Sequence, residues 1–420
     1  MEVNADSFTY HHTLKGRRFR LLQLKPKDGL QRLRLDLVER NLDSSEPYTA
    51  LSYTWGDPTP CRPVLCNGKW LLLAESLHTF LDGLADAPAH ERPDLLWADG
   101  ICINQKNNEE KTEQVRMMRD IYSRAEHVII WLGVGRPDDE KGIELMELLC
   151  KKLPEPEPGS AMDGFAPGED LFDFSELGIP VDTSYWRALV DILQRPWFSR
   201  VWIIQELCSA RSFEFWIGEW IIEPEFVLGV QGRLHRYVSV KAMWLPHQGT
   251  GSPSTSQALA LLKTDVDNGY SVPLFSLFFH IRGFKVTDPR DRIFAILPLT
   301  AEADLEIIDY SLQLPAVILQ LVRKYFVNKD FDVGLLSFIE RPFEQRIHSL
   351  SWVPELQFSE TFTPMIAHFP ASMPMGKVQA EFVWGHEPVS SLCDTLDPRE
   401  HWKNFCLWLT LSGICNILYF

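Results

Sequence analysis

A single carboxylate stands in an apolar, tryptophan-rich segment near the middle of the chain. The segment is RPWFSRVWIIQEL at residues 195–207, and the carboxylate belongs to Glu206. An acid is rarely buried alone, because removing its charge from water is costly unless a partner neutralises it. Glu206 is therefore either ion-paired with Arg195 or Arg200, or kept unpaired for chemistry.

Two earlier segments each combine a strand pattern with a polar loop. In YTALSYTWGD, residues 48–57, large and small side chains alternate up to a Gly-Asp turn, which predicts a strand over 50–55. In LLWADGICINQ, residues 95–105, a short buried strand leads to Asp99. Asp99 is interpreted either as a ribose or partner contact or as an ordinary loop hydrogen bonder. The tryptophans Trp55 and Trp97 are expected in the core.

Taken in this order, the three segments resemble the sequence blocks of the fungal heterokaryon incompatibility (HET) domain over about 47–210. The second block continues as EEKTEQVRMMRDIY at 109–122. Further along, TDPRDRIFAIL at 287–297 and LSWVP at 350–354 resemble stretches that often follow this domain. The resemblance implies a non-self recognition effector that triggers regulated cell death in a fungus.

The same segments are similar, more remotely, to the TIR fold. A strand ending in Ser-Tyr and a later Trp-x-x-x-Glu-Leu helix have counterparts here in residues 51–53 and 202–207. In enzymatic TIR domains that glutamate cleaves NAD+, so the resemblance implies Glu206 as the catalytic residue and NAD+ as the substrate. It implies the following residues as the binding site: Ser52, Tyr53, Asp57, Asp99 and Trp202. The pattern departs at Ile203, where such enzymes have cysteine.

One carboxylate is enough for this chemistry. Cleavage of an N-glycosidic bond passes through a sugar cation that a nearby carboxylate stabilises, and nicotinamide leaves as a neutral ring that needs no second acid. On a helix, Trp202 and Glu206 are four residues apart and are expected to share a face. The chain has no Gly-rich dinucleotide or Walker motif, so a Rossmann dehydrogenase or P-loop ATPase is not supported.

A second hypothesis needs no enzyme. The HET domain can instead act as a signalling module that binds a protein partner or associates with itself. A cysteine nucleophile at Cys102 or Cys208 is a weaker enzymatic alternative, because neither has an adjacent histidine in the sequence.

Composition limits the partners and the compartment. The chain has 420 residues, 41 basic against 57 acidic, and a formal charge of −16, which argues against nucleic-acid binding. Cys61 and Cys66 lack the further ligands that a zinc site needs, so we expect no metal. The N-terminus lacks the pattern of a signal peptide, and the apolar stretch 405–420 is too short and polar for a stable membrane span. These features favour a cytoplasmic protein.

The pattern of elements predicts an α/β fold. Residues 1–44 are expected to form a lead-in hairpin, residues 45–210 a TIR-like (flavodoxin-like) parallel sheet flanked by helices, and residues 211–420 a mainly helical region. An acidic, Pro- and Gly-rich stretch at 154–182 is expected to be an exposed, poorly ordered insertion. A linker is expected at 245–256. The other predicted elements are strands at 17–24, 32–38, 127–132, 213–218 and 220–222, and helices at 74–84, 108–124, 274–281 and 316–326. Asn107 and Glu110 have the spacing of a capping box for the helix at 108–124, and its apolar residues are expected to face the sheet: Val115, Met118, Ile121 and Tyr122.

Overall fold

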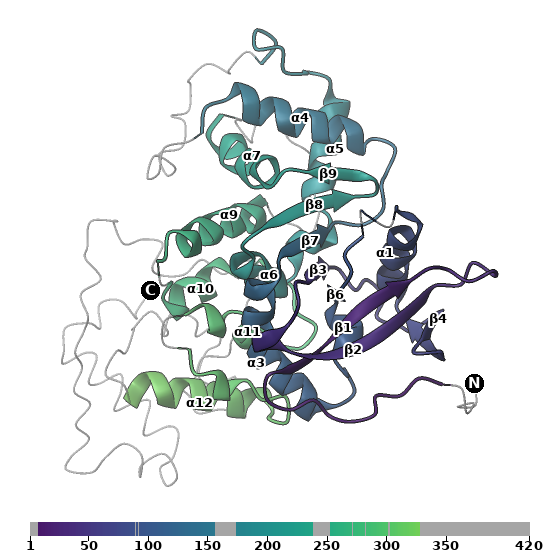
Figure 1. The fold of residues 1–420 in the computed structure, drawn as a ribbon. Coiled ribbons are helices and arrows are strands. Elements are labelled where there is room, and N and C mark those ends of the chain that lie inside the picture. Colours follow the sequence, from purple (N-terminus) through teal and green to yellow (C-terminus); the bar gives the residue numbers. More distant parts are fainter. Residues whose placement is uncertain are drawn as a thin grey trace, which may run out of the picture. The chain divides into compact units, whose positions relative to one another are not determined.

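The computed structural model describes residues 7–88, 90, 92–155, 174–237, 253–270, 272–281, 283–300 and 303–327. The chain divides into two compact units, Met1–Ser311 and Leu312–Phe420. In the second unit the described residues contain one helix, α12 (Leu314–Val327). All other elements belong to the first unit, which is shown in Figure 1.

A nine-stranded mixed sheet is the centre of the first unit. Its strands lie in the order β5-β4-β2-β1-β6-β3-β7-β8-β9. Their bounds are β1 Arg18–Lys25, β2 Arg34–Asn41, β3 Thr49–Tyr53, β4 Arg62–Cys66, β5 Lys69–Leu73, β6 Leu96–Trp97, β7 His127–Trp131, β8 Phe213–Ile217 and β9 Trp220–Ile222. The chain is therefore of the mixed α/β class, and the sheet extends beyond 45–210 at both edges.

The four strands β6, β3, β7 and β8 are parallel and lie side by side. Numbered in chain order, they lie in the order 2-1-3-4, the same order that begins a flavodoxin-like sheet. In β3 and β7 the last four residues of each strand are all buried, so both faces of these strands are covered. The coarser expectation of an α/β sheet flanked by helices is confirmed, and the carboxyl ends of its parallel strands all lie at one edge.

Strands β1 and β2 form a hairpin within the range of the predicted lead-in, and this hairpin is part of the sheet. β1 pairs with β2 in antiparallel register from Arg18–Asn41 to Lys25–Arg34, and β1 also pairs antiparallel with β6. The second edge continues as β8 and β9, which form a hairpin around Gly218. Strands of one sheet thus lie on both sides of the predicted boundaries at 44 and 210, and the division into three parts stays a prediction from the sequence.

Helices surround the parallel strands (Figure 1). In the first unit the longer ones are α1 Glu75–Asp86, α3 Asn108–Arg124, α4 Asp139–Lys152, α5 Thr183–Leu193, α6 Trp202–Ser209, α7 Pro224–Tyr237, α9 Pro253–Asp267 and α10 Leu274–His280. The short ones are α2 Asp99–Cys102, α11 Asp291–Phe294, η1 Leu42–Ser44, η4 Pro196–Ser199, η5 Leu297–Leu299 and η6 Leu305–Ile307. Helix α6 packs against α3 and α9, and α4 packs against α5 and α7.

Helix α3 shows why the sequence pattern worked locally. Asn107 caps it by accepting the Glu110 backbone N–H at 3.2 Å, as the predicted capping motif requires. Its apolar residues Val115, Met118 and Ile121 are buried as expected. The Glu110 side chain does not turn back to the cap, however, because it is used in a buried ion pair with Arg20.

Changing Met118 to aspartate is expected to lower the free energy of unfolding by about 2–3 kcal/mol, because it buries a charge without a partner. Met118 is 4% exposed. Chemical denaturation of the full chain measures the effect. Leu261→Asp is a matched control, since Leu261 lies on α9 and is 51% exposed. Equal midpoints for the two variants would show that the buried face of α3 is misassigned.

Helices α4 and α5 approach each other closely at Gly142. A Cβ atom at this position would lie 2.8 Å from the Ala188 carbonyl carbon and 2.9 Å from its oxygen, which is too close for any other residue. A buried ion pair joins the same region to η4, because Arg195 Nη2 lies 2.6 Å from Asp139 Oδ2. The guanidinium also donates to the carbonyls of Leu132 and Val134 at 3.0 Å.

Two expectations for the loops need correction. The end of the predicted insertion at 154–182 is packed, because Phe174 and Ile179 are 4% and 2% exposed and the Phe174 ring contacts Trp186. The predicted linker at 245–256 overlaps α9, which begins at Pro253. Residues 156–173 and 238–252 lie outside the described residues, as does the apolar stretch 405–420. Within the described part, no helix combines the length and apolar character needed to cross a membrane.

Candidate active site at the carboxyl ends of the parallel strands

Glu206 lies in α6 with its carboxylate turned to the end of β3. The residue is 2% exposed, and Ser52 Oγ donates a short hydrogen bond to Glu206 Oε2. The indole N–H of Trp197 in turn donates to Ser52 Oγ at 2.8 Å. The serine hydroxyl thus accepts from the indole and donates to the acid, so it is oriented from both sides.

Neither of the two predicted arginine partners forms an ion pair with Glu206. Arg195 is used by Asp139, and Arg200 Nη1 instead donates to the Tyr53 backbone carbonyl. The Arg200 charge still acts on Glu206 at longer range. Burial raises the pKa of Glu206 to about 7, against the lowering effect of Arg200 and together with the raising effect of Asp99. Glu206 can therefore change its charge near neutral pH.

A second acid, Asp99, lies at the same end of the sheet. It is the first residue of α2, directly after β6, and it is half-buried. The Trp55 indole N–H lies 3.0 Å from both carboxylate oxygens, and the Tyr53 hydroxyl also donates to Asp99. Burial raises the pKa of Asp99, against the lowering effects of Arg200 and of these hydrogen bonds. Asp99 does more than bond within its own loop, because both donors come from the end of β3.

The two acids bind side chains that point to opposite faces of β3, but both lie at the same end of that strand. Successive side chains on a strand point to opposite faces, so Ser52 and Tyr53 face opposite sides of the sheet. Ser52 binds Glu206 on one side, and Tyr53 binds Asp99 on the other. Arg200 holds the Tyr53 carbonyl at the strand end, and its charge acts on both acids. The result is a cluster of two acids and one cation at the edge where α/β sheets bind ligands.

Gly100 is part of the close packing in this cluster. A Cβ atom there would collide with the Tyr53 hydroxyl and would contact a Leu77 methyl group at 3.7 Å. Only glycine leaves room for Tyr53 to reach Asp99. Three residues of the cluster are half-buried and so partly reach solvent: Trp55, Asp99 and Arg200. The other three, Ser52, Tyr53 and Glu206, are buried.

Two predicted site residues lie elsewhere. Asp57 is exposed in the loop after β3, where its carboxylate accepts the Thr59 N–H at 2.9 Å. Trp202 begins α6, and its indole donates to Asp291 of α11 rather than sharing a site with Glu206. Trp202 and Glu206 are one turn apart on α6, but the Trp202 side chain binds Asp291 and so points away from Glu206.

The cysteine alternative loses support. Cys102 and Cys208 are buried, and burial raises the pKa of each thiol to about 12. A thiol with such a pKa holds almost no thiolate at neutral pH, and the thiolate is the nucleophile. No described group of three or more His, Cys, Asp or Glu side chains could hold a metal ion.

Three contacts of the acid cluster were not predicted from the sequence. Trp55 was expected in the core but bonds Asp99 at the surface of the cluster, whereas Trp97 is in the core as expected. Trp197 was not singled out, and Arg200 was considered only as an ion-pair partner. The Pro196 turn that presents Trp197 and Arg200 was a usable signal, since it separates α5 from α6.

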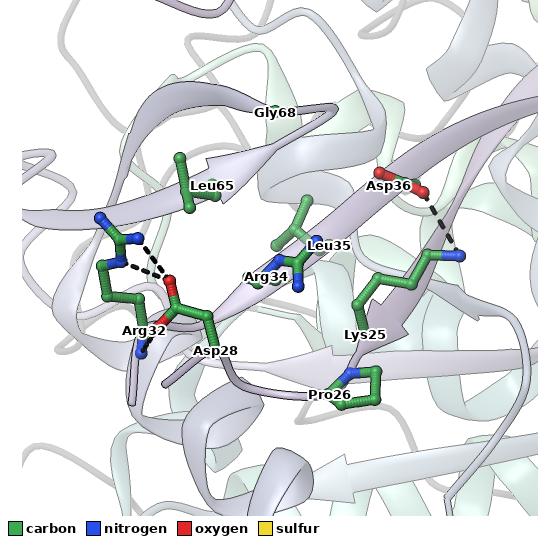
Figure 2. Close-up of a pocket in the computed structure, with 9 residues that line it drawn as sticks. All are labelled: Lys25, Pro26, Asp28, Arg32, Arg34, Leu35, Asp36, Leu65 and Gly68. Carbon is green, nitrogen blue, oxygen red and sulfur yellow. Dashed lines mark hydrogen bonds and ion pairs between the residues drawn. The ribbon is translucent and has the colours of Figure 1, made fainter. Parts of the chain in front are cut away.

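A pocket of about 440 Å³ lies away from these acids, between the β1–β2 and β4–β5 turns (Figure 2). Its charged side chains are largely paired with one another, as Arg32 with Asp28 at 2.5 Å and Lys25 with Asp36 at 3.3 Å. Because β1 runs antiparallel to β6, the β1–β2 turn lies towards the amino ends of the parallel strands. The pocket is therefore separate from the acid cluster.

The described part of the chain is thus a mixed α/β domain with one buried and one half-buried acid at the carboxyl ends of its parallel strands. Residues 48–206 match the family described as Heterokaryon incompatibility protein (HET), and this range holds the whole acid cluster. This part of the chain, less than half of its length, is thus similar to the HET family.

The chain is also similar to Heterokaryon incompatibility protein 6, OR allele, of Neurospora crassa. The two are 27% identical over 296 residues, which cover 61% of this chain and 43% of the Neurospora protein. The match therefore spans less than half of the length of that curated relative. No solved structure matches the chain.

Proposed function

We propose that this protein acts in heterokaryon incompatibility, as a non-self recognition effector that triggers regulated cell death in a fungus. The HET domain over 48–206 and the similarity to a Neurospora protein named for heterokaryon incompatibility support this proposal. The proposal includes a protein partner or self-association as the trigger, and a cytoplasmic site of action.

We further propose that the effector activity is TIR-like NAD+ glycohydrolysis by Glu206. The observation that carries it is the buried Glu206 carboxyl, which Ser52 orients and no cation pairs within 4 Å among the described residues. A structural acid this deeply buried is expected to have an ion partner. Glu206 instead retains a pKa of about 7, the range in which a group can serve as a base at neutral pH.

The reaction assigns one role to the acid. The bond between the nicotinamide nitrogen and the ribose carbon breaks, and its electron pair leaves with neutral nicotinamide. Ionised Glu206 stabilises the resulting sugar cation and accepts a proton from the attacking water, whose oxygen bonds to the ribose carbon. That proton passes to solvent, so the products are nicotinamide, ADP-ribose and H+.

The neighbouring residues would bind the substrate. Asp99 and Tyr53 offer oxygens to the ribose hydroxyls, Ser52 keeps Glu206 in position, and Arg200 supplies a cation for the pyrophosphate. Glu206 is covered in this conformation, so cleavage requires a movement that admits the ribose to its carboxylate. Self-association or partner binding is the proposed cause of that movement.

Loss of NAD+ in the presence of the concentrated 420-residue chain tests the proposal. Glu206→Gln is expected to lower the rate at least about 100-fold, because it removes the charge that stabilises the cation. The rate of the parent should rise with pH through about 7, as Glu206 ionises. Glu214→Gln is the matched control, since this half-buried acid lies on β8 and is held by Trp216 and His127. Equal rates for parent and Glu206→Gln would exclude the catalytic role.

A second function is favoured by the low exposure of Glu206, which is 2%. In this alternative the HET domain is a signalling module that binds a protein partner and cleaves nothing. Expression of the full chain in a fungal host separates the two. If Glu206→Gln folds normally and kills cells as well as the parent, the interaction module is the correct function.

A further inference from the structure

Residues 7–14, here called the N-terminal strap, are attached to the sheet by their own contacts. Ser7 forms a bridge with Trp70 on the edge strand β5, and the Phe8 N–H donates to the Trp70 carbonyl at 2.8 Å. Further along, His12 Nε2 lies 2.8 Å from Glu39 Oε2 on β2. The strap is thus attached both to the edge strand β5 and to β2 before the chain enters β1.

Between these attachments the strap reaches α2, the short helix that begins with Asp99. The Tyr10 hydroxyl donates to the Ile101 carbonyl at 2.8 Å. The Arg20 guanidinium lies over the Tyr10 ring at 4.6 Å and donates to the Cys102 carbonyl at 3.2 Å. Carbonyls in the last turn of a helix lack partners within it, and α2 has only four residues. Tyr10 and Arg20 supply the partners that its last two residues lack.

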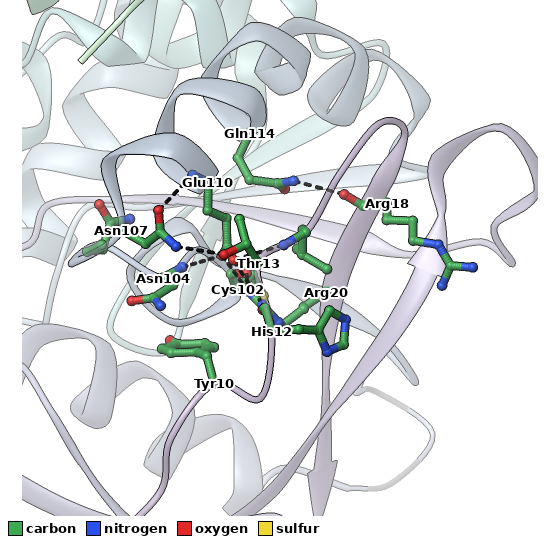
Figure 3. Close-up of polar contacts among 12 residues, drawn as sticks. Tyr10, His12, Thr13, Arg18, Arg20, Cys102, Asn104, Asn107, Glu110 and Gln114 are labelled. Carbon is green, nitrogen blue, oxygen red and sulfur yellow. Dashed lines mark hydrogen bonds and ion pairs between the residues drawn. The ribbon is translucent and has the colours of Figure 1, made fainter. Parts of the chain in front are cut away.

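Glu110 fixes the arginine that makes this contact (Figure 3). Its carboxylate lies 2.6 and 3.1 Å from the two Arg20 nitrogens that donate to it. It also accepts the backbone N–H of Leu14 at 3.2 Å and of Asn104 at 2.7 Å. The strap, β1 and the loop after α2 therefore converge on one buried carboxylate.

We propose that Tyr10 and Arg20 are positioning residues for the acid cluster. They hold the carboxyl end of α2, and α2 carries Asp99 at its first position, where Trp55 and Tyr53 bind it. Because α2 has only four residues, contacts that fix its last residues also fix the position of Asp99. The consequence for catalysis rests on the proposed function, because small displacements of a binding group slow a reaction by about 10- to 100-fold.

The Trp55 indole N–H provides a readout that does not depend on catalysis, since it donates to Asp99 at 3.0 Å. We would record indole resonances of the ¹⁵N-tryptophan-labelled full chain, assigning Trp55 with Trp55→Phe. Tyr10→Phe deletes only the hydroxyl and keeps the ring on Arg20. We expect it to shift or broaden the Trp55 resonance and leave that of Trp186, whose indole bonds Pro180 in a distant part of the unit.

His12→Ala is the control, because it removes a strap contact to β2 without touching α2. It should leave Trp55 unchanged. If Tyr10→Phe also leaves Trp55 unchanged, the positioning role is overturned. If the resonance moves while the parent cleaves no NAD+, the positioning role stands and the proposed function fails. If the parent is active, Tyr10→Phe should lower kcat/KM about 10-fold or more, with part of the loss as a higher KM because Asp99 is proposed to bind the ribose.

Discussion

Replacing Glu110 with glutamine is expected to lower the free energy of unfolding by about 3–5 kcal/mol. The pair that Glu110 forms with Arg20 is almost fully buried, with side-chain exposures of 0% and 8%. Glutamine keeps the size of the side chain but leaves the arginine charge buried without a counter-charge. In the parent, the backbone N–H groups of Leu14 and Asn104 donate to the Glu110 carboxylate. In the variant, the amide NH2 group faces one of these donors and cannot accept its hydrogen bond.

Urea unfolding of the full chain measures this effect, with Glu113→Gln as the matched control. Glu113 is on the same helix and pairs with Arg116 at 3.3 Å, but its side chain is 37% exposed. Exposed pairs of this kind contribute about 0.5 kcal/mol. A Glu110 variant no less stable than the Glu113 variant would mean that the buried pair does not hold the three segments together.

The stability of the parent relative to Glu206→Gln is expected to fall as the pH rises from about 4.5 to 7. Burial raises the pKa of Glu206 from 4.5 to about 7, so the folded state holds the proton more tightly than the unfolded state. A carboxyl of this kind stabilises the fold fully below its unfolded pKa, and the contribution is lost as pH rises through the folded pKa. The total change is about 3 kcal/mol, at about 1.4 kcal/mol per pH unit.

Unfolding curves of both proteins at pH 5, 6, 7 and 8 give this difference directly. The free energy of unfolding of the glutamine variant should rise relative to that of the parent up to about pH 7, and the difference should then stay constant. Glu109→Gln serves as the control, because Glu109 lies on α3 and its side chain is exposed. A difference between parent and Glu206→Gln that does not vary with pH would mean that Glu206 titrates as an ordinary surface acid.

Local patterns in the sequence were sufficient for most elements. The buried face of α3, its cap at Asn107 and the continuous apolar strand at β7 follow from spacing alone. The insertion at 154–182 shows the limit of composition. The segment is acidic and rich in proline as a whole, but Phe174 and Ile179 in its carboxyl-terminal part are buried. Composition averages over a segment, whereas packing depends on single side chains.

The site was predictable only in part, because its contacts join distant residues. Ser52 and Glu206 are 154 positions apart, and the sequence suggested both without indicating that they touch. The partners of the arginines were not predictable, since Arg195 binds Asp139 on a different helix. Trp202 shows the reverse case. Helical spacing aligned it with Glu206, but the tertiary contact with Asp291 decides its direction.

Gly142 shows that the acid cluster depends on a position that carries no chemistry. The absence of a side chain there lets α4 and α5 touch, and α5 leads directly into the turn that presents Trp197 to Ser52. A methyl group at this position would act as a wedge between two helices. Any larger residue at position 142 therefore requires α4 and α5 to move apart.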